Sequence, residues 1–285
     1  MSRRLHESLG INLGRIYMFL KWAEQILVVA WFEIRKFRAG RKWFFPILLA
    51  AAPVCLVMLL LLFDPRPPNN SEITQIFAVM FQTFMLRLMV LFGCALVFAN
   101  LYRGDMVTRT IHFYLLTPVR REVLVAGKYL AGLLITSILY GGSVGITNTL
   151  IHSANGSAVA NAHFFGGPGM NELFSYVGIA VLGCVGYGSV FMVTGFLFKN
   201  PAIPAAFLLL WESANVFLPA ALQKISVVHY LQSIVPVPIP LGPFAVITAP
   251  SSVFGSVSGL AVFTVAVLLV NGLMMRRAEI DYSSD

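Results

Sequence analysis

Charged side chains are scarce in this sequence. Asp, Glu, Lys and Arg make up 11% of its 285 residues, whereas hydrophobic residues make up 58%. A typical soluble domain carries roughly 25% charged residues, and it needs them to cover its surface. The shortage of charge therefore argues against an ordinary soluble domain and predicts an integral membrane protein.

Cysteine is almost absent as well. Cys55, Cys94 and Cys184 each lie inside an apolar stretch, and such an odd, scattered set provides neither a disulfide framework nor the spacing of a metal site. The first ten residues, MSRRLHESLG, lack the apolar core and cleavage site of a signal peptide. We therefore expect the N-terminus to be retained.

Motifs of enzyme chemistry are missing too. There is no HExxH motif and no Gly-x-Ser-x-Gly elbow. Gly127-Lys128 resembles the end of a phosphate-binding loop, but Glu122 occupies the place of its first glycine and Tyr129 the place of its Ser or Thr. We expect this chain to be no enzyme and to bind no metal or cofactor.

What the sequence does have is six apolar runs, each near the roughly 20 residues that a helix needs to cross a bilayer. They are residues 43–63, 76–99, 124–150, 173–198, 202–222 and 253–275. The sequence thus predicts an all-α integral membrane protein with a domain of six transmembrane helices over residues 43–275. A cytoplasmic N-terminus (1–42) precedes this domain and a cytoplasmic tail (276–285) follows it.

Positive charge lies mainly on one side of these runs. With both termini cytoplasmic, the inner segments hold 17 of the 20 Lys and Arg residues, and only Arg66 and Lys224 fall outside. The remaining one, Arg87, lies within the second run. The positive-inside rule then fixes the orientation of a multi-pass protein. This placement explains the net charge of +8, so no nucleic-acid partner is expected.

Ahead of the first run, residues 26–42 contain an apolar stretch too short to cross the bilayer. Its apolar side chains lie near one helical face at Ile26, Val29, Ala30 and Phe37. Arg35 and Arg38 are placed to reach lipid head groups, which predicts an amphipathic interfacial helix in contact with membrane lipids. An ordinary cytosolic helix is the alternative.

The most polar interruption is residues 103–128, RGDMVTRTIHFYLLTPVRREVLVAGK. Residues 105–117 have the pattern of one short helix with Asp105, Arg109 and His112 on its polar face, and Pro118 ends it. A helix restarts with Arg120, Arg121 and Lys128 at the cytoplasmic edge of the third run. Such a helix along the inner surface is suited to receive another protein; the alternative is a charged loop that only sets topology.

Residues 104–134, GDMVTRTIHFYLLTPVRREVLVAGKYLAGLL, resemble the signature between the second and third spans of ABC-2 type transporter permeases. The residues that carry the resemblance are Asp105, Thr110, Leu115, Leu116, Pro118, Arg121 and Lys128. Asp105 stands where Glu is usual, and Arg109 where Gly is usual. The six-span plan with a basic amphipathic N-terminal helix is similar to the same family.

This resemblance implies a permease subunit in a bacterial inner membrane. Two such subunits, identical or homologous, would pair with separate ABC ATP-binding subunits that hydrolyse the ATP. The coupling segment would be residues 103–128, acting through Asp105, Arg109, Thr110, His112, Pro118, Arg120 and Arg121. The expected function is export of a lipid-like or amphipathic substrate, and the alternative is a non-transporting anchor or scaffold subunit. A secondary transporter is disfavoured because the sequence has no inverted repeat.

Two ionisable residues lie deep inside the runs. Arg87 is 12 residues from the inner end of the second run, and Glu212 is 10 residues from the inner end of the fifth. Their depths therefore differ by only ~3 Å. A charge at that depth costs roughly 2.5–3.5 kcal/mol unless it is paired or wetted. Both a structural ion pair and a polar translocation path remain open.

Glycines gather on the fourth run at positions 178, 183, 186 and 188. Small residues let transmembrane helices approach closely. We expect this side of the fourth span to be a helix-packing face.

Overall fold

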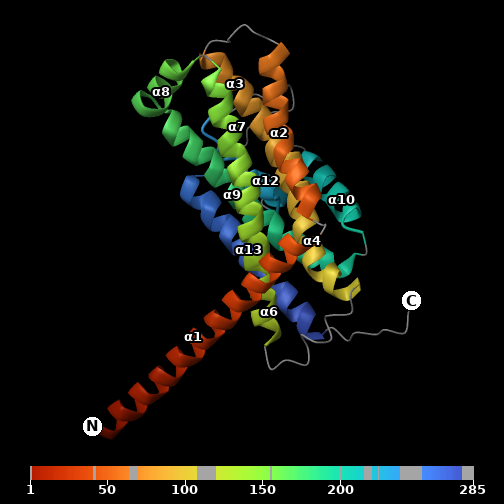
Figure 1. Ribbon diagram of the computed structural model, residues 1–285. Coiled ribbons are helices and arrows are strands. Elements are labelled where there is room, and N and C mark those ends of the chain that lie inside the picture. Colours follow the sequence, from red (N-terminus) through yellow and green to blue (C-terminus); the bar gives the residue numbers. More distant parts are fainter. Residues whose placement is uncertain are drawn as a thin grey trace.

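The computed structural model describes residues 2–40, 43–63, 70–107, 120–154, 156–198, 200–214, 220–223, 225–237 and 252–277. These residues form helices and connecting turns, with no strand among them. The helices pack into an elongated bundle, and α1 (Ser2–Ala39) extends away from one end of it (Figure 1). The expected all-α class is confirmed over the described residues.

Two of the membrane helices are composite. The second span joins α3 (Asn70–Met80), the π-helix η2 (Phe81–Val90) and α4 (Leu91–Val107). The third joins α6 (Arg121–Thr136), the short π-helix η3 (Ser137–Gly141) and α7 (Gly142–Ser153). The other helices are α2 (Phe44–Phe63), α8 (Ser157–Gly166), α9 (Gly169–Leu197), α10 (Ala202–Ala214), α11 (Ala220–Gln223), α12 (Val227–Gln232) and α13 (Val253–Arg277).

Five helices in the described residues are long and apolar enough to cross a membrane: Phe44–Phe63, Glu72–Leu101, Arg121–Ser153, Gly169–Leu197 and Val253–Arg276. They agree with five of the six predicted runs. In the fifth run, 202–222, the described residues form α10 (Ala202–Ala214) and the start of α11 (Ala220–Gln223), and residues 215–219 lie outside the described part of the chain. A sixth span over this run therefore stays a prediction.

The ends of α9 and α13 lie at the same end of the bundle as the start of α6. α9 ends beside α4, near Ala99, and α13 ends beside the first turn of α6, where Arg121 donates to its carbonyls. The chain must therefore cross the bundle once between the end of α9 and the start of α13. The described part of that interval contains the helices α10, α11 and α12.

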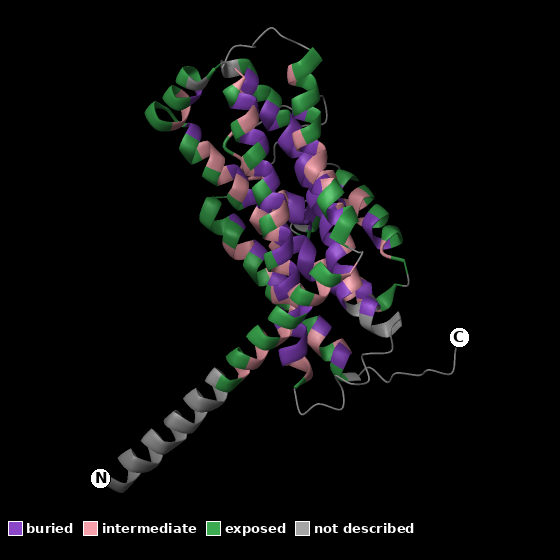
Figure 2. Ribbon diagram, in the orientation of Figure 1, coloured by how far each residue is buried: buried purple, intermediate pink, exposed green. Residues whose placement is uncertain are grey.

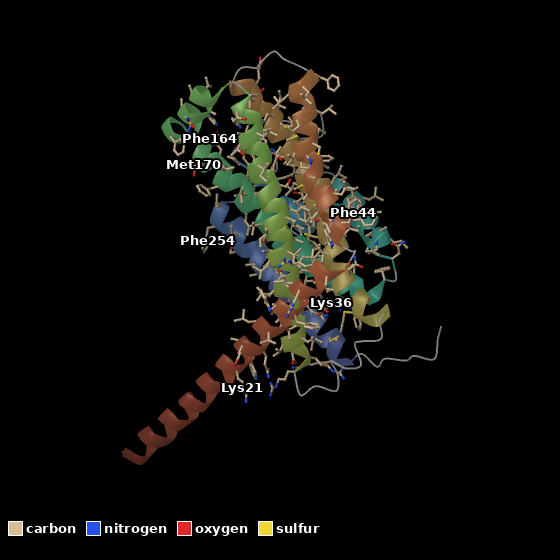
Figure 3. The ribbon with its side chains drawn as sticks, viewed as in Figure 1. Lys21, Lys36, Phe44, Phe164, Met170 and Phe254 are labelled. Carbon is tan, nitrogen blue, oxygen red and sulfur yellow. The ribbon has the colours of Figure 1, made fainter. Side chains whose placement is uncertain are left out.

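The interior is formed around α9, which packs against α4, α6, α7, α12 and α13. Figure 2 shows buried residues along the inner sides of these helices and exposed residues on the outer sides. The most peripheral spans, α2 and α13, expose large apolar side chains. Two of these, Phe44 and Phe254, are labelled in Figure 3. An outer surface of this kind suits contact with lipid.

Glycine allows close approach at some positions of α9 and not at others. A Cβ on Gly195 would lie 2.6 Å from the Cα of Ala99 in α4, and one on Gly188 would lie 2.5 Å from the Phe98 ring. A Cβ on Gly178 would meet nothing within 4 Å. The packing face expected from the sequence therefore excludes Gly178 and continues to Gly195.

This contrast predicts opposite effects of the same substitution at two glycines of α9. Gly195→Ala should lower the free energy of unfolding by about 1–3 kcal/mol, because the new methyl group meets backbone that cannot move aside. Gly178→Ala should be neutral or stabilising by up to about 1 kcal/mol, because alanine is the better helix former and the site is open. Unfolding by SDS in mixed micelles, followed by circular dichroism, measures both; the reverse order would contradict the α4–α9 contact.

At the end of the bundle opposite α1, two histidines stack between α7 and α8. The ring centroids of His152 and His163 lie 4.5 Å apart with planes 7° from parallel. His152 Nδ1 lies 2.8 Å from the Asn148 carbonyl and donates to it, because a carbonyl only accepts. Stacked rings do not aim their in-plane lone pairs at one point, and no trio of possible metal ligands gathers in the described residues.

The orientation expected from the charges can be tested at the two ends of the bundle. Asn161 on α8 and Lys21 on α1 are both exposed. In a cysteine-free background, Asn161→Cys should react with an impermeant maleimide in intact cells, and Lys21→Cys should react only after the membrane is opened. If Lys21→Cys reacted in intact cells, the predicted orientation would be wrong and α1 would lie outside.

Candidate functional site

A buried ion pair fastens α1 to the third span. Lys128 Nζ in α6 lies 2.5 Å from Glu33 Oε1 in α1 and donates to the carbonyl of Leu101 in α4 at 3.1 Å. The two side chains are 1% and 3% exposed. One ammonium group thus holds three helices together, and each of its contacts is charge-assisted or buried.

The close approach of α1 and α6 depends on the residue next to this lysine. A Cβ on Gly127 would lie 2.6 Å from the Val29 side chain and 3.0 Å from the carbonyl oxygen of Ile26. Only glycine leaves room for α1 at this crossing. Gly127-Lys128 is therefore a helix-packing element inside α6, and its lysine is committed to Glu33 rather than placed in a loop.

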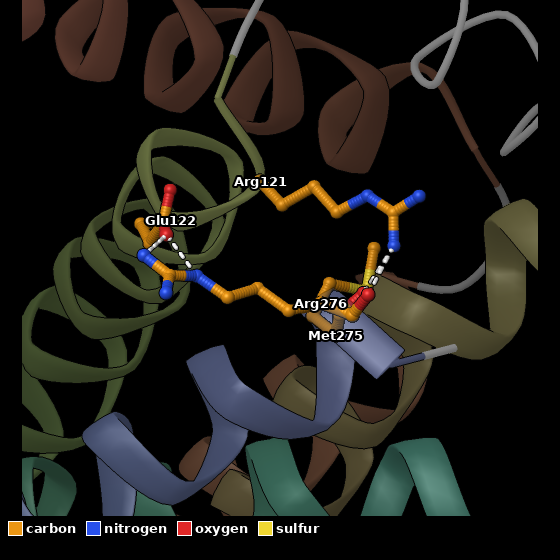
Figure 4. Close-up of polar contacts among 4 residues, drawn as sticks. All are labelled: Arg121, Glu122, Met275 and Arg276. Carbon is orange, nitrogen blue, oxygen red and sulfur yellow. Dashed lines mark hydrogen bonds and ion pairs between the residues drawn. The ribbon is translucent and has the colours of Figure 1, made fainter.

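The first turn of α6 is also joined to the last turn of α13 (Figure 4). Arg121 Nη1 donates to the carbonyls of Met275 and Arg276, each at 2.8 Å, and so satisfies carbonyls at the end of a helix. Glu122 pairs with the Arg276 guanidinium in the same place. Both partners of this second pair are largely exposed, so it contributes at most about 1 kcal/mol.

Arg120, just before α6, contacts α1 further toward its N-terminus. Its guanidinium carbon lies 4.8 Å from the centre of the Trp22 ring, in cation–π geometry. We call these contacts together the inner clamp: Lys128 with Glu33 and Leu101, Arg121 and Glu122 with the end of α13, and Arg120 with Trp22. The clamp links α1, α4, α6 and α13 at one end of the bundle.

The inner clamp surrounds both ends of the predicted coupling segment. The backbone of Asp105 belongs to the last turn of α4, and Arg120 and Arg121 lie at the start of α6. Arg109, Thr110, His112 and Pro118 lie outside the described residues, as does the short helix expected over most of 105–117. The structure therefore locates the two ends of this segment.

Two placements differ from what the sequence suggested. Arg121 had been expected to face a partner, but its Nη1 donates to the end of α13. Lys128 had been expected at the edge of the third span, but it is buried. Sequence reasoning also missed Glu33. A signal for it exists, because Glu33 follows Val29 by four residues and Ala30 by three and so shares their apolar face.

Near the middle of the membrane helices, Arg87 and Glu212 are neighbours without being paired. Glu212 in α10 is 1% exposed and accepts hydrogen bonds from Ser226 Oγ, from Val227 N at 3.1 Å and from Val228 N at 3.3 Å. It therefore caps the N-terminus of α12 and joins the two short helices. No ion pair between Arg87 and Glu212 occurs among the described residues, although the two charges are close enough to act on each other.

No protein-family model matches the chain, and no curated protein matches it in sequence. The similarity of residues 104–134 to the ABC-2 permease signature thus stays a resemblance.

The buried pair of the inner clamp predicts a characteristic pattern of stabilities. Lys128→Met alone should lower the free energy of unfolding by about 3–5 kcal/mol, because it leaves the Glu33 carboxylate buried without its partner. Lys128→Met combined with Glu33→Leu should be less destabilising than the single change, because no charge remains buried. A double-mutant cycle measured by SDS unfolding gives the coupling, and strictly additive losses would show that the pair does not hold α1.

Proposed function

We propose that this chain is the membrane-spanning subunit of an ATP-driven transporter of the ABC-2 type. Two copies, or one copy and a homologous permease, would assemble with two separate ATP-binding subunits in a bacterial inner membrane. The substrate would be lipid-like or amphipathic, and export would be the direction of transport.

The observation that carries this proposal is the inner clamp around the two ends of residues 108–119. This polar segment follows α4 and precedes α6, and Lys128 ties these two helices to each other and to α1. A partner that moves the segment therefore acts on three helices that are joined through buried contacts. This is what a coupling element requires, because its displacement must reach the spans rather than be absorbed in a loose loop.

The position of α1 supports the same proposal. Its apolar residues Ile26 and Val29 face α6, while Leu27, Val28, Trp31 and Phe32 are exposed on the other side. That second apolar surface suits the inner leaflet, with Arg35 and Arg38 at head-group level. The helix would then lie at the membrane surface beside the coupling segment.

The decisive test is association with an ATPase through the segment itself. Affinity purification of the tagged wild-type chain from membranes of its own host should retain an ATP-binding-cassette subunit, identified by mass spectrometry. Arg109→Glu should lower the retained amount about tenfold or more, because it places a like charge against an acidic docking surface. It should leave insertion and thermal stability of the chain unchanged.

Arg35→Glu provides the matched control, because it reverses an exposed basic residue of α1 at the same end of the bundle. It should retain the ATPase at the wild-type level. If the wild-type chain retains no ATP-binding-cassette subunit, the transporter proposal is wrong. If Arg109→Glu retains as much as Arg35→Glu, the coupling role of the segment is wrong and a topological anchor remains.

A further inference from the structure

The centre of the membrane domain contains an arginine, Arg87, that forms no ion pair with any residue that the structure describes. Arg87 lies at the middle of the continuous span Glu72–Leu101, about 20 Å from either end. Its Nε is buried and has no hydrogen-bond partner, and it forms no ion pair with another described residue. The side chain is only partly buried, so part of the guanidinium is accessible from the surface of the single chain.

Hydrogen-bond donors exceed acceptors at this point. The hydroxyl of Tyr187 in α9 is buried without a partner, and it is close enough to Arg87 and Glu212 to interact with both charges. Glu212 accepts three hydrogen bonds from the start of α12, and none of these donors is Arg87 or Tyr187. Buried donors without acceptors are uncommon in folded proteins and indicate a missing partner.

A second copy of this chain does not supply the missing charge. Glu212 is the only acidic residue in the six apolar runs, so a symmetric partner offers no other carboxylate at this depth. Lipid chains offer none either, and a bare guanidinium at the bilayer centre is costly. A counter-charge paired directly with Arg87 is thus missing among the described residues, and a bound molecule could supply it.

The backbone around Arg87 is itself unusual. Residues Phe81–Val90 form a ten-residue π-helix, a rare geometry that usually occurs as a single turn and often at functional sites. One turn earlier, the Gln82 amide donates to the carbonyl of Val237 at 3.1 Å, which ties the π-helix to the chain after α12. Arg87 is thus held on an element that is anchored on both sides.

We propose that Arg87, with Tyr187 beside it, binds the anionic oxygen group of an amphipathic molecule at mid-membrane depth. The ligand chemistry is a phosphate or carboxylate on an apolar body, with the guanidinium as the charged donor. This deepens the proposed transport function and rests on it for the identification of the ligand as cargo. The binding itself requires no ATPase.

The test uses the purified full-length chain in neutral detergent. Its thermal unfolding, followed by tryptophan fluorescence, is measured during titration with short-chain phosphatidylglycerol, phosphatidylcholine of the same chain length, or glycerol 3-phosphate. Phosphatidylglycerol should raise the melting temperature saturably, and phosphatidylcholine should not. A comparable rise with glycerol 3-phosphate would show that the site takes a free phosphate and would contradict the requirement for an apolar body.

Substitutions then assign the site. Arg87→Gln should weaken the response to phosphatidylglycerol at least about tenfold, whereas Arg87→Lys, which keeps the charge, should retain part of it. Arg35→Gln on exposed α1 should respond like the wild type, which separates the site from head-group binding at the surface. An undiminished response in Arg87→Gln, or no anion-specific response in the wild type, would overturn the proposal.

The two proposals fail separately. A chain that binds phosphatidylglycerol through Arg87 but retains no ATPase keeps the anion site and loses the transporter assignment. A chain that retains its ATPase through Arg109 but shows no response dependent on Arg87 keeps the transporter assignment and loses the anion site.

Discussion

The buried contact between Lys128 and Glu33 is the interaction on which the arrangement of the inner end depends. Removing two charges from water costs free energy, and their mutual attraction offsets that cost only when the hydrogen bonds between them are well oriented. Here the lysine also donates to the Leu101 carbonyl, so the contact is satisfied in only one relative position of α1, α4 and α6. Such a pair adds little net stability over an apolar contact, but it specifies register, because a shift of α1 by one turn would separate the two charges from each other. The absent Cβ of Gly127 makes that register sterically possible.

The same residue types are used differently at mid-membrane depth. Glu212 and Arg87 would make an ion pair if depth alone decided their contacts, yet the carboxylate instead caps α12 through Ser226 and two backbone amides. Three hydrogen bonds at a helix N-terminus satisfy a carboxylate well, and they also join α10 to α12. Arg87 Nε is buried without a hydrogen-bond partner beside this arrangement.

Hydropathy was sufficient to find five of the spans, because twenty apolar residues have few alternatives to a helix in a membrane. Over 202–222 the span stays a prediction, because residues 215–219 lie outside the described part of the chain. A count of apolar residues also does not register that Glu212 accepts hydrogen bonds from the start of α12. Charge placement predicts sidedness, but it contains no information about contacts. From the sequence alone, Arg121 and Lys128 both belong to the edge of the third span. Lys128 is buried because it contacts Glu33 in α1, which is more than 90 residues away in the sequence. Matched depth suggested that Arg87 and Glu212 could pair, but the sequence gives no sign of the competing donors at Ser226 and Val227.

The inner clamp and Arg87 belong to one mechanical element. α3, η2 and α4 form an unbroken helical rod from Asn70 to Val107, so the end that meets the coupling segment and the turn that holds Arg87 are about 30 Å apart on the same rod. A displacement of residues 108–119 by a docked partner would therefore move α4, to which they are directly connected. The π-helix is the place where such a rod yields most easily, because its hydrogen-bond ladder is already offset by one residue. A small change in winding there would rotate Arg87 relative to Tyr187, which is fixed in α9. In the proposed transporter, the strength with which an anionic group is held at mid-membrane would follow the position of the coupling segment, with no contact between ligand and ATPase.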